Sequence, residues 1–430
     1  MTRGAIGSTM LDQCVKGMPG GVSPFRLDDI GRHGWNVLRE DLPLPLAVLK
    51  ESALTHNGQW MRAFLKQSGA VIAPHGKTTM SPQLFDRQMA DGAWAITVAT
   101  PHQLQVAREF GFQRVVLANQ LIGRQAIRYV VDELRRDPAF DFYCLIDSEA
   151  NAAELARHAD AARLERPLQL LIEGGFLGGR AGCRTVNEAL AVARAIRASG
   201  PRLALRGVEC FEGLSRGAGP EESERQVVAF LDFVVEIAVG CEREGLFSPG
   251  QIILSAGGSK YYDIVVERFG RAQIGPDVLI VTRSGCYLTH DSALYRRAFE
   301  RLITRSPRLA DLGVGLTPAL EVLAYVQSRP EPTKVLLTLG QRDVSSDELP
   351  VALAWLRPGN ATPLPISGGH QVTRLNDQHC HMTVPSDSPL AVGDLVSFGI
   401  SHPCLTFDKW QVICVVDDDY NVVSAIRTFF

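Results

Sequence analysis

A lysine between a glycine and two threonines follows an apolar run in the stretch APHGKTTMSP, residues 73–82. The trio Gly76-Lys77-Thr78 looks like the end of a phosphate-binding P-loop, whose pattern is Gly-x-x-x-x-Gly-Lys-[Ser/Thr]. That pattern requires a glycine at position 71, where the chain has Val71. The loop that would wrap the phosphates is missing, so the sequence excludes a nucleoside triphosphatase of this type.

Lys77 nevertheless stands where a lysine can do chemistry. The apolar run 69–73 predicts a β-strand, which places Lys77 just beyond the carboxyl end of that strand. In parallel α/β proteins this end of the strands carries the chemistry. A lysine there can be desolvated, which makes its amine available to form an imine with a carbonyl group. The alternative is an exposed loop lysine without a catalytic role.

Strand-like and helix-like segments alternate from about residue 48 to residue 300. The predicted strands are 69–73, 93–98, 115–118, 142–146, 168–172, 203–208, 251–255 and 278–281. The predicted helices are 81–91, 101–110, 123–135, 148–158, 185–199 and 220–244. Short buried strands separated by helices indicate a parallel sheet. About eight such units in roughly 250 residues is the size of a (β/α)8 TIM barrel, with a doubly wound open sheet as the alternative.

The pattern changes after about residue 310. Short strand-like runs follow one another without an intervening helical pattern, and Pro, Gly and Asp separate them; these runs are 317–328, 334–338, 371–375, 381–384, 394–398 and 410–416. Such a series predicts a separate β-domain. The expected domains are therefore an N-terminal segment over residues 1–45 that packs on the β-domain, a barrel over residues 46–305, and a β-domain over residues 306–430.

The composition narrows the classes of partner. The chain has 430 residues, is 46% hydrophobic and carries a net charge of -3, which gives no electrostatic reason to expect nucleic acid or an anionic membrane. The first residues lack the apolar core of a signal peptide, and we expect no membrane-spanning segment. Nine scattered cysteines without a Cys-x-x-Cys pair indicate reduced thiols in a cytoplasmic protein.

Several segments resemble, in the same order, the fold type III pyridoxal-phosphate enzymes. They are Pro-His-x-Lys-Thr (74–78), AITVATPHQLQVAREFGFQRVVLANQLIG (95–123), CLIDSEANAAEL (144–155) and LLIEGGFLGGRAGCRT (170–185). Within this group the chain is similar to the D-serine dehydratase and D-threonine aldolase branch of the alanine racemase-like superfamily. The resemblance implies an alanine racemase-like N-terminal barrel, a C-terminal antiparallel β-domain, pyridoxal 5'-phosphate as cofactor and a D-amino acid as substrate. It also implies a homodimer.

The resemblance assigns roles to three residues around the cofactor ring. Lys77 matches the family lysine that forms an imine with the cofactor aldehyde, and the same amine can act as a base at Cα. His75 should line the same pocket, although a packed and hydrogen-bonded histidine is an equally good interpretation. Arg180 matches the arginine that approaches the ring hydroxyl oxygen. The family's aspartate or asparagine early in this segment is Glu173 here, which is a departure from the pattern.

Two further segments resemble cofactor-binding parts of the family. The stretch SAGGSKYYD, residues 255–263, resembles the Gly-Gly-[Ser/Thr] phosphate loop. The amide N–H groups of Gly257, Gly258 and Ser259 would hold the phosphate dianion there. A plain tight turn is the alternative. In RSGCYLTHD, residues 283–291, the resemblance implies that Tyr287 faces the cofactor pocket.

The stretch SHPCLTF, residues 401–407, carries a His-x-Cys pair. His402 and Cys404 match the metal-ligand pair of the dehydratase branch, in which zinc lies beside the substrate hydroxyl. An imidazole nitrogen and a thiolate suit Zn2+, and two protein ligands leave positions open for substrate and water. The aldolase branch uses His-x-Asp with Mn2+ or Mg2+, so a cysteine favours zinc and elimination, with Mn2+ or Mg2+ as the alternative metals.

The stretch NDQHCHM, residues 376–382, lies where the family has an acidic-acidic-His-Gly motif. Asp377 and His379 match that motif approximately, whereas Gln378 and Cys380 depart from it. His379 or His381 is therefore a candidate for an extra metal ligand or for a group that supports one.

We therefore expect a lyase that acts on a β-hydroxy D-amino acid and resembles D-serine dehydratase, giving a 2-oxo acid and ammonia. The first alternative is a D-threonine aldolase-type enzyme, which gives glycine and an aldehyde. A racemase is disfavoured because no second catalytic base is evident. Two hypotheses of another class are a non-catalytic pyridoxal-phosphate carrier and a barrel without a cofactor.

Overall fold

The computed structural model describes residues 3–214 and 217–430. Two residues of the predicted N-terminal segment (1–2) and two of the predicted barrel (215–216) therefore lie outside the described residues. The chain divides into two compact units. The barrel unit comprises Ala63–Lys77 and Gly92–Gly285, and the unit that we call the β-unit comprises Met1–Arg62, Thr78–Asp91 and Cys286–Phe430.

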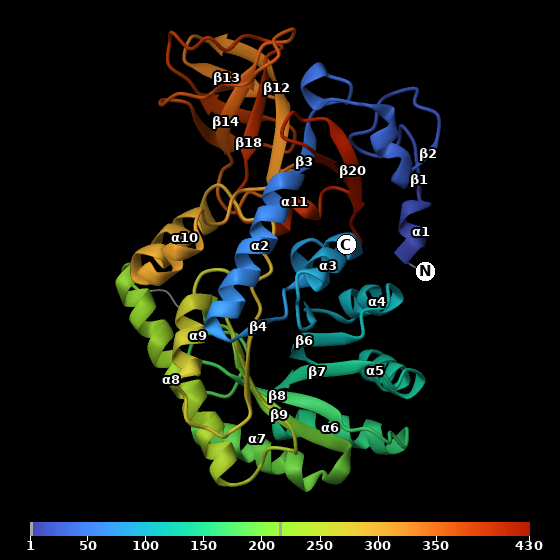
Figure 1. Ribbon diagram of the computed structural model, residues 1–430, viewed down its shortest axis with the longest axis vertical. Coiled ribbons are helices and arrows are strands. Elements are labelled where there is room, and N and C mark those ends of the chain that lie inside the picture. Colours follow the sequence, from blue (N-terminus) through green and yellow to red (C-terminus); the bar gives the residue numbers. More distant parts are fainter. Residues whose placement is uncertain (1–2, 215–216) are drawn as a thin grey trace. The chain divides into compact units, whose positions relative to one another are not determined.

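The barrel unit is built on eight parallel strands that curl into a barrel (Figure 1). They are β4 (Val71–Ile72), β5 (Ile96–Val98), β6 (Arg114–Gln120), β7 (Asp141–Ile146), β8 (Leu168–Gly174), β9 (Leu203–Cys210), β10 (Ile252–Ala256) and β11 (Val278–Thr282). Their order is β4-β11-β10-β9-β8-β7-β6-β5. A parallel bridge between His75 and Thr97 joins the first strand to the last. The predicted parallel barrel is confirmed.

Helices follow the strands and lie outside the sheet (Figure 1). They are α4 (Pro101–Glu109), α5 (Arg124–Arg136), α6 (Glu149–Ala161), α7 (Val186–Ala198), α8 (Pro220–Arg243) and α9 (Tyr262–Gly270). The helices predicted in this region are confirmed, and α9 was not predicted. Helix α5 shows why such a segment is helical, because its buried residues Ile127, Val130, Val131 and Leu134 recur at a spacing of three to four.

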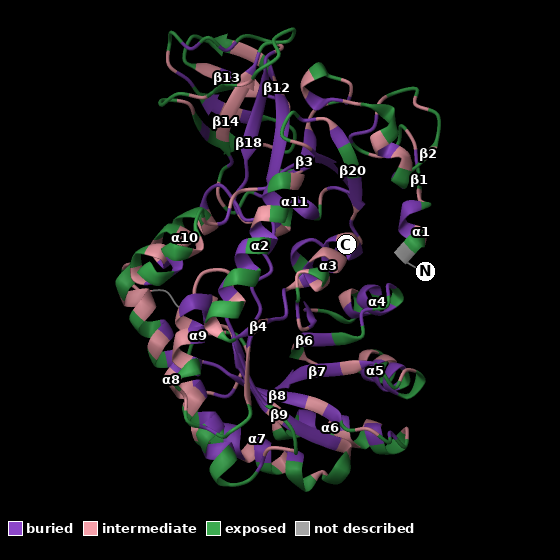
Figure 2. Ribbon diagram, in the orientation of Figure 1, coloured by how far each residue is buried: buried purple, intermediate pink, exposed green. Residues whose placement is uncertain are grey.

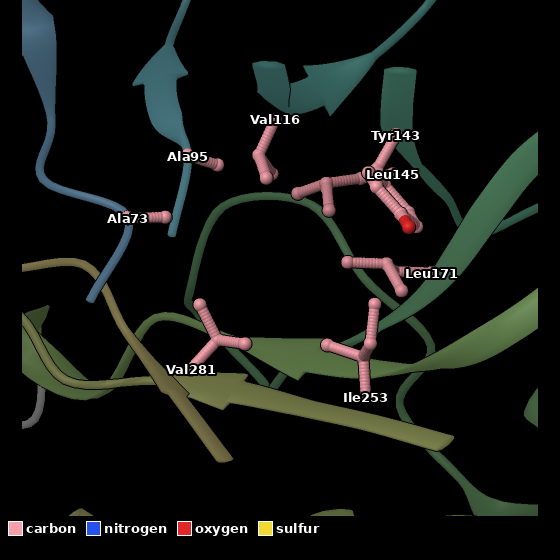
Figure 3. Close-up of a cluster of buried hydrophobic side chains, with 8 residues drawn as sticks. All are labelled: Ala73, Ala95, Val116, Tyr143, Leu145, Leu171, Ile253 and Val281. Carbon is pink, nitrogen blue, oxygen red and sulfur yellow. The ribbon is translucent and has the colours of Figure 1, made fainter. Parts of the chain in front are cut away.

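Apolar side chains from seven of the eight strand segments fill the barrel (Figure 3). Tyr143 and Leu145 both point inward from β7, because alternate residues of a strand share one face. At Gly207, strand β9 lies so close to β10 that an added Cβ would meet the carbonyl oxygen of Ile253. The packed interior forces any ligand to bind at the rim, among the loops that follow the strands.

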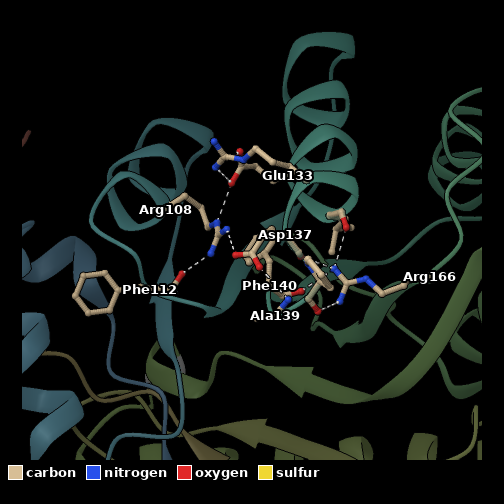
Figure 4. Close-up of polar contacts among 10 residues, drawn as sticks. Arg108, Phe112, Glu133, Asp137, Ala139, Phe140 and Arg166 are labelled. Atoms are coloured by element: carbon tan, nitrogen blue, oxygen red, sulfur yellow. Dashed lines mark hydrogen bonds and ion pairs between the residues drawn. The ribbon is translucent and has the colours of Figure 1, made fainter. Parts of the chain in front are cut away.

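A buried guanidinium ties helices α4 and α5 of the barrel unit together (Figure 4). Arg108 donates to Glu133 at 2.9 Å, to Asp137 at 2.6 Å and to the carbonyl oxygen of Phe112 at 3.0 Å. Its guanidinium also lies 4.0 Å from the ring centroid of Phe140. Arg108 and Glu133 are both buried. When one of them is removed, water cannot take its place, and the other is left as an unpaired buried charge.

Replacing Arg108 by alanine is expected to lower the free energy of unfolding by about 3 kcal/mol, because among the described residues buried Glu133 then keeps only the exposed Arg136 as an ion-pair partner. Urea denaturation would measure the change. The matched control is Arg128→Ala on α5, the helix that carries Glu133, because Arg128 is exposed and forms its ion pair with exposed Asp132. The control should change stability by less than about 0.5 kcal/mol. Similar losses in both variants would contradict the account.

The β-unit contains a mixed sheet. Its strands are β3 (Leu46–Lys50), β12 (Leu320–Glu331), β13 (Lys334–Leu337), β14 (Val351–Leu356), β15 (Leu364–Pro365), β16 (Gln371–Leu375), β17 (Cys380–Thr383), β18 (Leu395–Gly399), β19 (Val412–Val416) and β20 (Val422–Arg427). The main path runs β15-β14-β18-β12-β13-β17-β16, with β3 joining β12 to β19 and β19 pairing with β20. All these pairs are antiparallel except β3 with β19. The predicted antiparallel C-terminal domain is confirmed.

The remaining elements of this unit are short or peripheral. A small antiparallel pair joins β1 (Met10–Leu11) to β2 (Phe25–Arg26), and the helices are α1 (Arg3–Gly7), α3 (Pro82–Ala90), α10 (Leu294–Arg305) and α11 (Cys404–Phe407). Helix α2 (Glu51–Ser68) begins in this unit and ends in the barrel unit. The Asn36 side-chain amide donates to Asn421 at 2.9 Å, so part of the N-terminal segment contacts the chain near β20.

Some expected boundaries differ in detail from the observed elements. Strand β3 falls in the range predicted for the barrel, yet it pairs with β12 and β19 in the sheet of the β-unit. Strands β14, β15 and β20 were not predicted. The strands of the barrel unit are mostly buried, as are β3, β18 and β19 of the β-unit, whereas β14 is mainly half-buried (Figure 2). No helix in the described part of the chain is long and apolar enough to cross a membrane.

His290, in the β-unit, predicts a pH dependence of stability. The side chain is 3% exposed, and burial together with the charge of Arg296 lowers the pKa of His290 to about 4. In the unfolded chain the pKa is about 6.5, so the unfolded state binds the proton first and stability falls as the pH drops from 6.5 through 4.

Between pH 7 and pH 5 the free energy of unfolding should therefore fall by about 2 kcal/mol more in the natural protein than in the His290→Gln variant. Denaturant unfolding at the two pH values measures both proteins. Equal pH dependence in the two proteins would show that folding does not lower the pKa of His290 and would contradict the account.

Candidate active site

Charged side chains gather at the carboxyl-terminal rim of the barrel. Glu173 and Glu209 lie at the ends of β8 and β9, Glu212 lies in a short turn after β9, and Arg283 follows β11. All four are buried. Because the carboxyl ends of parallel strands meet at one rim, these residues converge from distant parts of the sequence. Buried charges at this rim are typical of a binding or catalytic site.

Lys77 and His75 occupy the same rim, after β4. Lys77 lies in the turn Gly76–Thr78, and its side chain is exposed. The His75–Thr97 bridge anchors the segment that leads into this turn. Burial, followed by the positive charge of Lys77, lowers the pKa of His75 well below its ordinary value. Nδ1 of His75 is buried and has no hydrogen-bond partner among the described residues, so one polar atom is available for a ligand here.

Glu209 and Arg283 form a buried ion pair that was not predicted. Arg283 donates to the Glu209 carboxylate and, at 2.8 Å, to the carbonyl oxygen of Cys210. Burial raises the pKa of Glu209 to about 8, while Arg283 acts in the opposite direction. Oε2 of Glu209 and Nε of Arg283 have no partner among the described residues. In the sequence, each is a charged residue close to the carboxyl end of a mainly apolar strand.

The predicted phosphate loop already holds an anionic group in this structure. The amide N–H of Gly257 donates to Glu212 Oε2 at 3.1 Å, and the amide N–H of Gly258 donates to Oε1 at 2.8 Å. Gly257 has a φ of 91°, and a Cβ there would come within 3.3 Å of Thr282, so glycine is required. The Ser284 hydroxyl fixes the loop by donating to the carbonyl oxygens of Gly257 and Gly258.

The two hydrogen bonds from Gly257 and Gly258 to Glu212 indicate what kind of group this loop can bind. Two adjacent amide N–H groups grip one carboxylate, which is how a backbone nest binds an anion. The Glu212 carboxylate stands in for that anion, so the loop fits a phosphate chemically. A phosphate that uses the same two amides requires Glu212 to move away from them. Ser259, the third predicted member, follows Gly258 and is half-buried.

Arg180 lies in the exposed loop that follows β8. Its guanidinium lies 4.7 Å from the ring centroid of Phe211, at the end of β9. The loop is held by the amide of Gly182, which donates to Asp147 at 2.9 Å, and by a bridge between Gly174 and Cys183. The charge of Arg180 also contributes to the lowered pKa of His75. Arg180 is therefore close enough to His75 for its charge to disfavour the protonated ring.

Tyr287 belongs to the β-unit rather than to the barrel unit. It is buried, its hydroxyl hydrogen-bonds with Gln88 of α3, and burial raises the pKa of Tyr287 above its ordinary value. Its predicted contact with the cofactor stays a prediction.

The predicted pair His402 and Cys404 forms a three-residue cluster with Cys286, all within the β-unit. The ligand atoms of these residues lie within 4.8 Å of one another. Cys286 follows β11, whereas His402 and Cys404 lie where the chain turns from β18 into α11. Among the described residues no other group of three such side chains could hold a metal ion. Cys286 was not predicted, because a single cysteine in a loop gives no spacing signal.

Carboxylates orient His402 within this cluster. Nδ1 of His402 lies 2.5 Å from Asp347 Oδ2, which leaves Nε2 as the ring nitrogen for a metal. The backbone N–H of His402 donates to Asp291 Oδ2 at 2.8 Å, and this holds the residue at a φ of 48°. A histidine backed by a carboxylate is the usual arrangement of a metal ligand.

His402 and Cys404 shift each other's pKa in opposite directions. The hydrogen bond to Cys404, with help from Asp347, raises the pKa of His402 to about 9. Hydrogen bonds from Cys286 and His402 lower the pKa of Cys404 well below its ordinary value. Both shifts arise from the close pairing of the Cys404 sulfur with the His402 ring. A metal binds cysteine as the thiolate and histidine as the neutral ring, so metal binding here would release the proton of His402. The residues present fit a zinc ion by ligand type.

His379 and His381 are not part of this cluster. Nε2 of His381 hydrogen-bonds with Asn376 at 2.8 Å across the β16–β17 turn. The side chain of His379 is exposed. A role of either histidine as an extra ligand, or as a group that supports one, stays a prediction.

Two family profiles match the chain. Residues 49–259 match "Alanine racemase, N-terminal domain", and residues 319–416 match "Putative serine dehydratase domain". The first match lies mainly in the barrel unit, and the second lies in the β-unit. No curated protein sequence matches the chain significantly.

Solved structures with the same fold cover nearly the whole chain. A D-threonine aldolase from Filomicrobium marinum is 18% identical, with a TM-score of 0.73 over 94% of this chain and 98% of that chain. A D-threo-3-hydroxyaspartate dehydratase from Delftia sp. HT23 is 19% identical, with a TM-score of 0.70 over 92% and 99%. An alanine racemase-like protein from Idiomarina loihiensis is 16% identical, with a TM-score of 0.66 over 90% and 96%. At these identities the likeness shows the fold.

Proposed function

Because this chain belongs to the alanine racemase-like superfamily of fold type III pyridoxal-phosphate enzymes, in its D-serine dehydratase and D-threonine aldolase branch, we propose that it is a metal-dependent lyase of β-hydroxy D-amino acids. The proposed reaction is elimination of the D-serine dehydratase type, which gives a 2-oxo acid and ammonia. The observation that carries this proposal is the thiol and imidazole cluster around His402 and Cys404. A ligand set of this kind favours zinc, which as a Lewis acid makes a hydroxyl a better leaving group.

The barrel rim would bind the cofactor. When bound, pyridoxal phosphate supplies an electron sink for the electron pair left at Cα. Lys77 would hold the aldehyde carbon of the cofactor and, once the substrate amine has replaced it, take the Cα proton. Gly257, Gly258 and Ser259 would hold the phosphate after Glu212 has released the loop.

Other residues at the rim would orient the ring. Arg180 would place a permanent cation at the ring hydroxyl oxygen. His75 would offer its buried Nδ1 to the same ligand. Because its pKa is low, His75 would be neutral at physiological pH and could accept or donate a hydrogen bond without adding charge. Tyr287 would line the pocket, as the resemblance implies.

The β-unit would supply the metal through His402 and Cys404. Support comes from the covalent order of the chain, since Thr78 directly follows Lys77 and its hydroxyl lies 3.6 Å from the sulfur of Cys404. Histidine-to-alanine and cysteine-to-alanine variants of the D-threo-3-hydroxyaspartate dehydratase have been solved, the latter in the metal-free form. By the same family resemblance we propose a homodimer.

A D-threonine aldolase-type reaction is the second candidate, because the aldolase of Filomicrobium marinum shares this fold with a TM-score of 0.73. It would use the same lysine but break the Cα–Cβ bond. Cys404 favours elimination, because a thiolate suits zinc better than Mn2+ or Mg2+.

A product screen tests the proposal. Purified enzyme is incubated with D-serine, D-threonine and D-threo-3-hydroxyaspartate, with and without a chelator, and keto acid, ammonia and aldehyde are measured. We expect keto acid and ammonia in equal amounts, lost on chelation. Glycine with an aldehyde would establish the aldolase reaction instead. An aldimine-type absorbance without turnover of any D-amino acid would indicate a non-catalytic carrier.

A further inference from the structure

We propose that Cys286 is a third protein ligand of the metal, beside His402 and Cys404. The inference rests on the metal site of the proposed function. It adds to that site one residue from outside the His-x-Cys pattern. Cys286 is separated from Cys404 by 118 positions, so the ligand is visible only in the folded chain.

The distance between the two sulfur atoms matches a shared metal. Sγ of Cys286 lies 3.8 Å from Sγ of Cys404. Two thiolates, each about 2.3 Å from one zinc ion at a tetrahedral angle, lie about 3.8 Å apart. A disulfide requires about 2.05 Å, so the pair is not positioned as a disulfide. The His402 ring nitrogen completes the group within 4.8 Å of both sulfurs.

The surroundings of Cys286 support a ligand role. The side chain is 4% exposed, so a metal held there would be largely shielded from bulk water. The Thr78 hydroxyl lies 3.8 Å from the sulfur of Cys286 and 3.6 Å from the sulfur of Cys404, within hydrogen-bonding distance of both. Asp347 supports His402 from the other side of the imidazole. Each ligand thus has an outer partner of the kind that orients metal ligands.

A third ligand changes what the metal can do. Two thiolates and one imidazole select zinc strongly over Mn2+ and Mg2+, which prefer oxygen. Three protein ligands leave a single open position on a four-coordinate zinc. That position can take one oxygen atom of a substrate, which fits activation of a lone β-hydroxyl group. A metal held this way also joins the loop after β11 to the turn before α11.

Metal binding without substrate tests the inference. Protein stripped with a chelator under reducing conditions is titrated with Co2+, whose thiolate charge-transfer absorbance reports bound sulfur, and with Zn2+ against a chromophoric competitor. The variants are Cys286→Ser, Cys404→Ser and Asp347→Asn, with Cys414→Ser as the control because Cys414 is buried in β19 of the same unit.

We expect Cys286→Ser to lose about half of the charge-transfer intensity, as Cys404→Ser does. Its Zn2+ affinity should fall by more than the roughly 10- to 100-fold expected for Asp347→Asn, which removes only an outer partner. Cys414→Ser should leave both values unchanged. Full charge-transfer intensity in Cys286→Ser, at any affinity, would overturn the inference.

Alkylation of the natural protein gives a second measurement that does not depend on the folding of a variant. Zn2+ should protect Cys286 and Cys404 from alkylation together, as read by peptide mass spectrometry. Protection of Cys404 alone would also overturn the inference. These readouts need no turnover, so they are independent of the product screen. If elimination occurs but Cys286 does not bind metal, only the third ligand is wrong.

Discussion

The Lys77→Ala variant is expected to lose covalent attachment of the cofactor and to lose turnover by more than about a thousandfold. The reason is that the proposed imine and the proposed base at Cα are the same amine, so one substitution removes both functions. Borohydride reduction followed by peptide mass spectrometry would find the cofactor mass on the peptide that contains residue 77 in the natural protein, and on no peptide of the variant.

Lys66→Ala is the matched control, because Lys66 is an exposed lysine of the barrel unit near the end of α2. It should keep the label on Lys77 and keep turnover. A label retained by Lys77→Ala, or found on another lysine of the natural protein, would contradict the assignment of Lys77. No label at all would support a barrel without this cofactor.

Removal of the metal should produce the second largest effect. Cys404→Ala, His402→Ala and chelation of the natural protein are each expected to lower elimination by more than about a hundredfold. The physical reason is that hydroxide is a poor leaving group unless a Lewis acid or a proton stabilises its charge. Steady-state assays with and without added Zn2+ would measure the loss.

The cofactor should remain attached in these metal-site variants, because Lys77 is untouched. Cys14→Ala is the control, since Cys14 is an exposed free cysteine outside the cluster. It should behave like the natural protein. Chelated enzyme that turns over at the full rate would show that the thiol and imidazole cluster has no part in the reaction.

The barrel could be predicted from sequence because each β/α unit is local. The apolar run of β8 and the helix α7 after it lie close together in the chain, and their patterns are read independently. The sheet of the β-unit was harder to predict, because its pairs join distant segments. Strand β3 pairs with β12, about 270 positions later, and no local pattern reveals such a pairing.

In the candidate site, too, residues in short local patterns could be predicted, whereas residues joined only by long-range contacts could not. Lys77 and the His402-x-Cys404 pair could be proposed from the sequence because their patterns are short and contiguous. Cys286 was missed, since its partners lie more than a hundred positions away and a cysteine in an apolar stretch looks like an ordinary buried thiol. Glu212 was missed for a related reason, because only the folded rim brings its carboxylate to Gly257 and Gly258.

In the proposed mechanism Lys77 takes the Cα proton and the metal activates the β-hydroxyl group, so the two steps can be observed separately. Exchange of the Cα hydrogen of D-serine in D2O, followed by NMR alongside keto-acid formation, tests it most directly. Metal-free enzyme should still exchange the Cα hydrogen while forming no keto acid, and Zn2+ should restore keto acid. Keto acid formed at the full rate without metal, or loss of exchange together with elimination on chelation, would contradict the account.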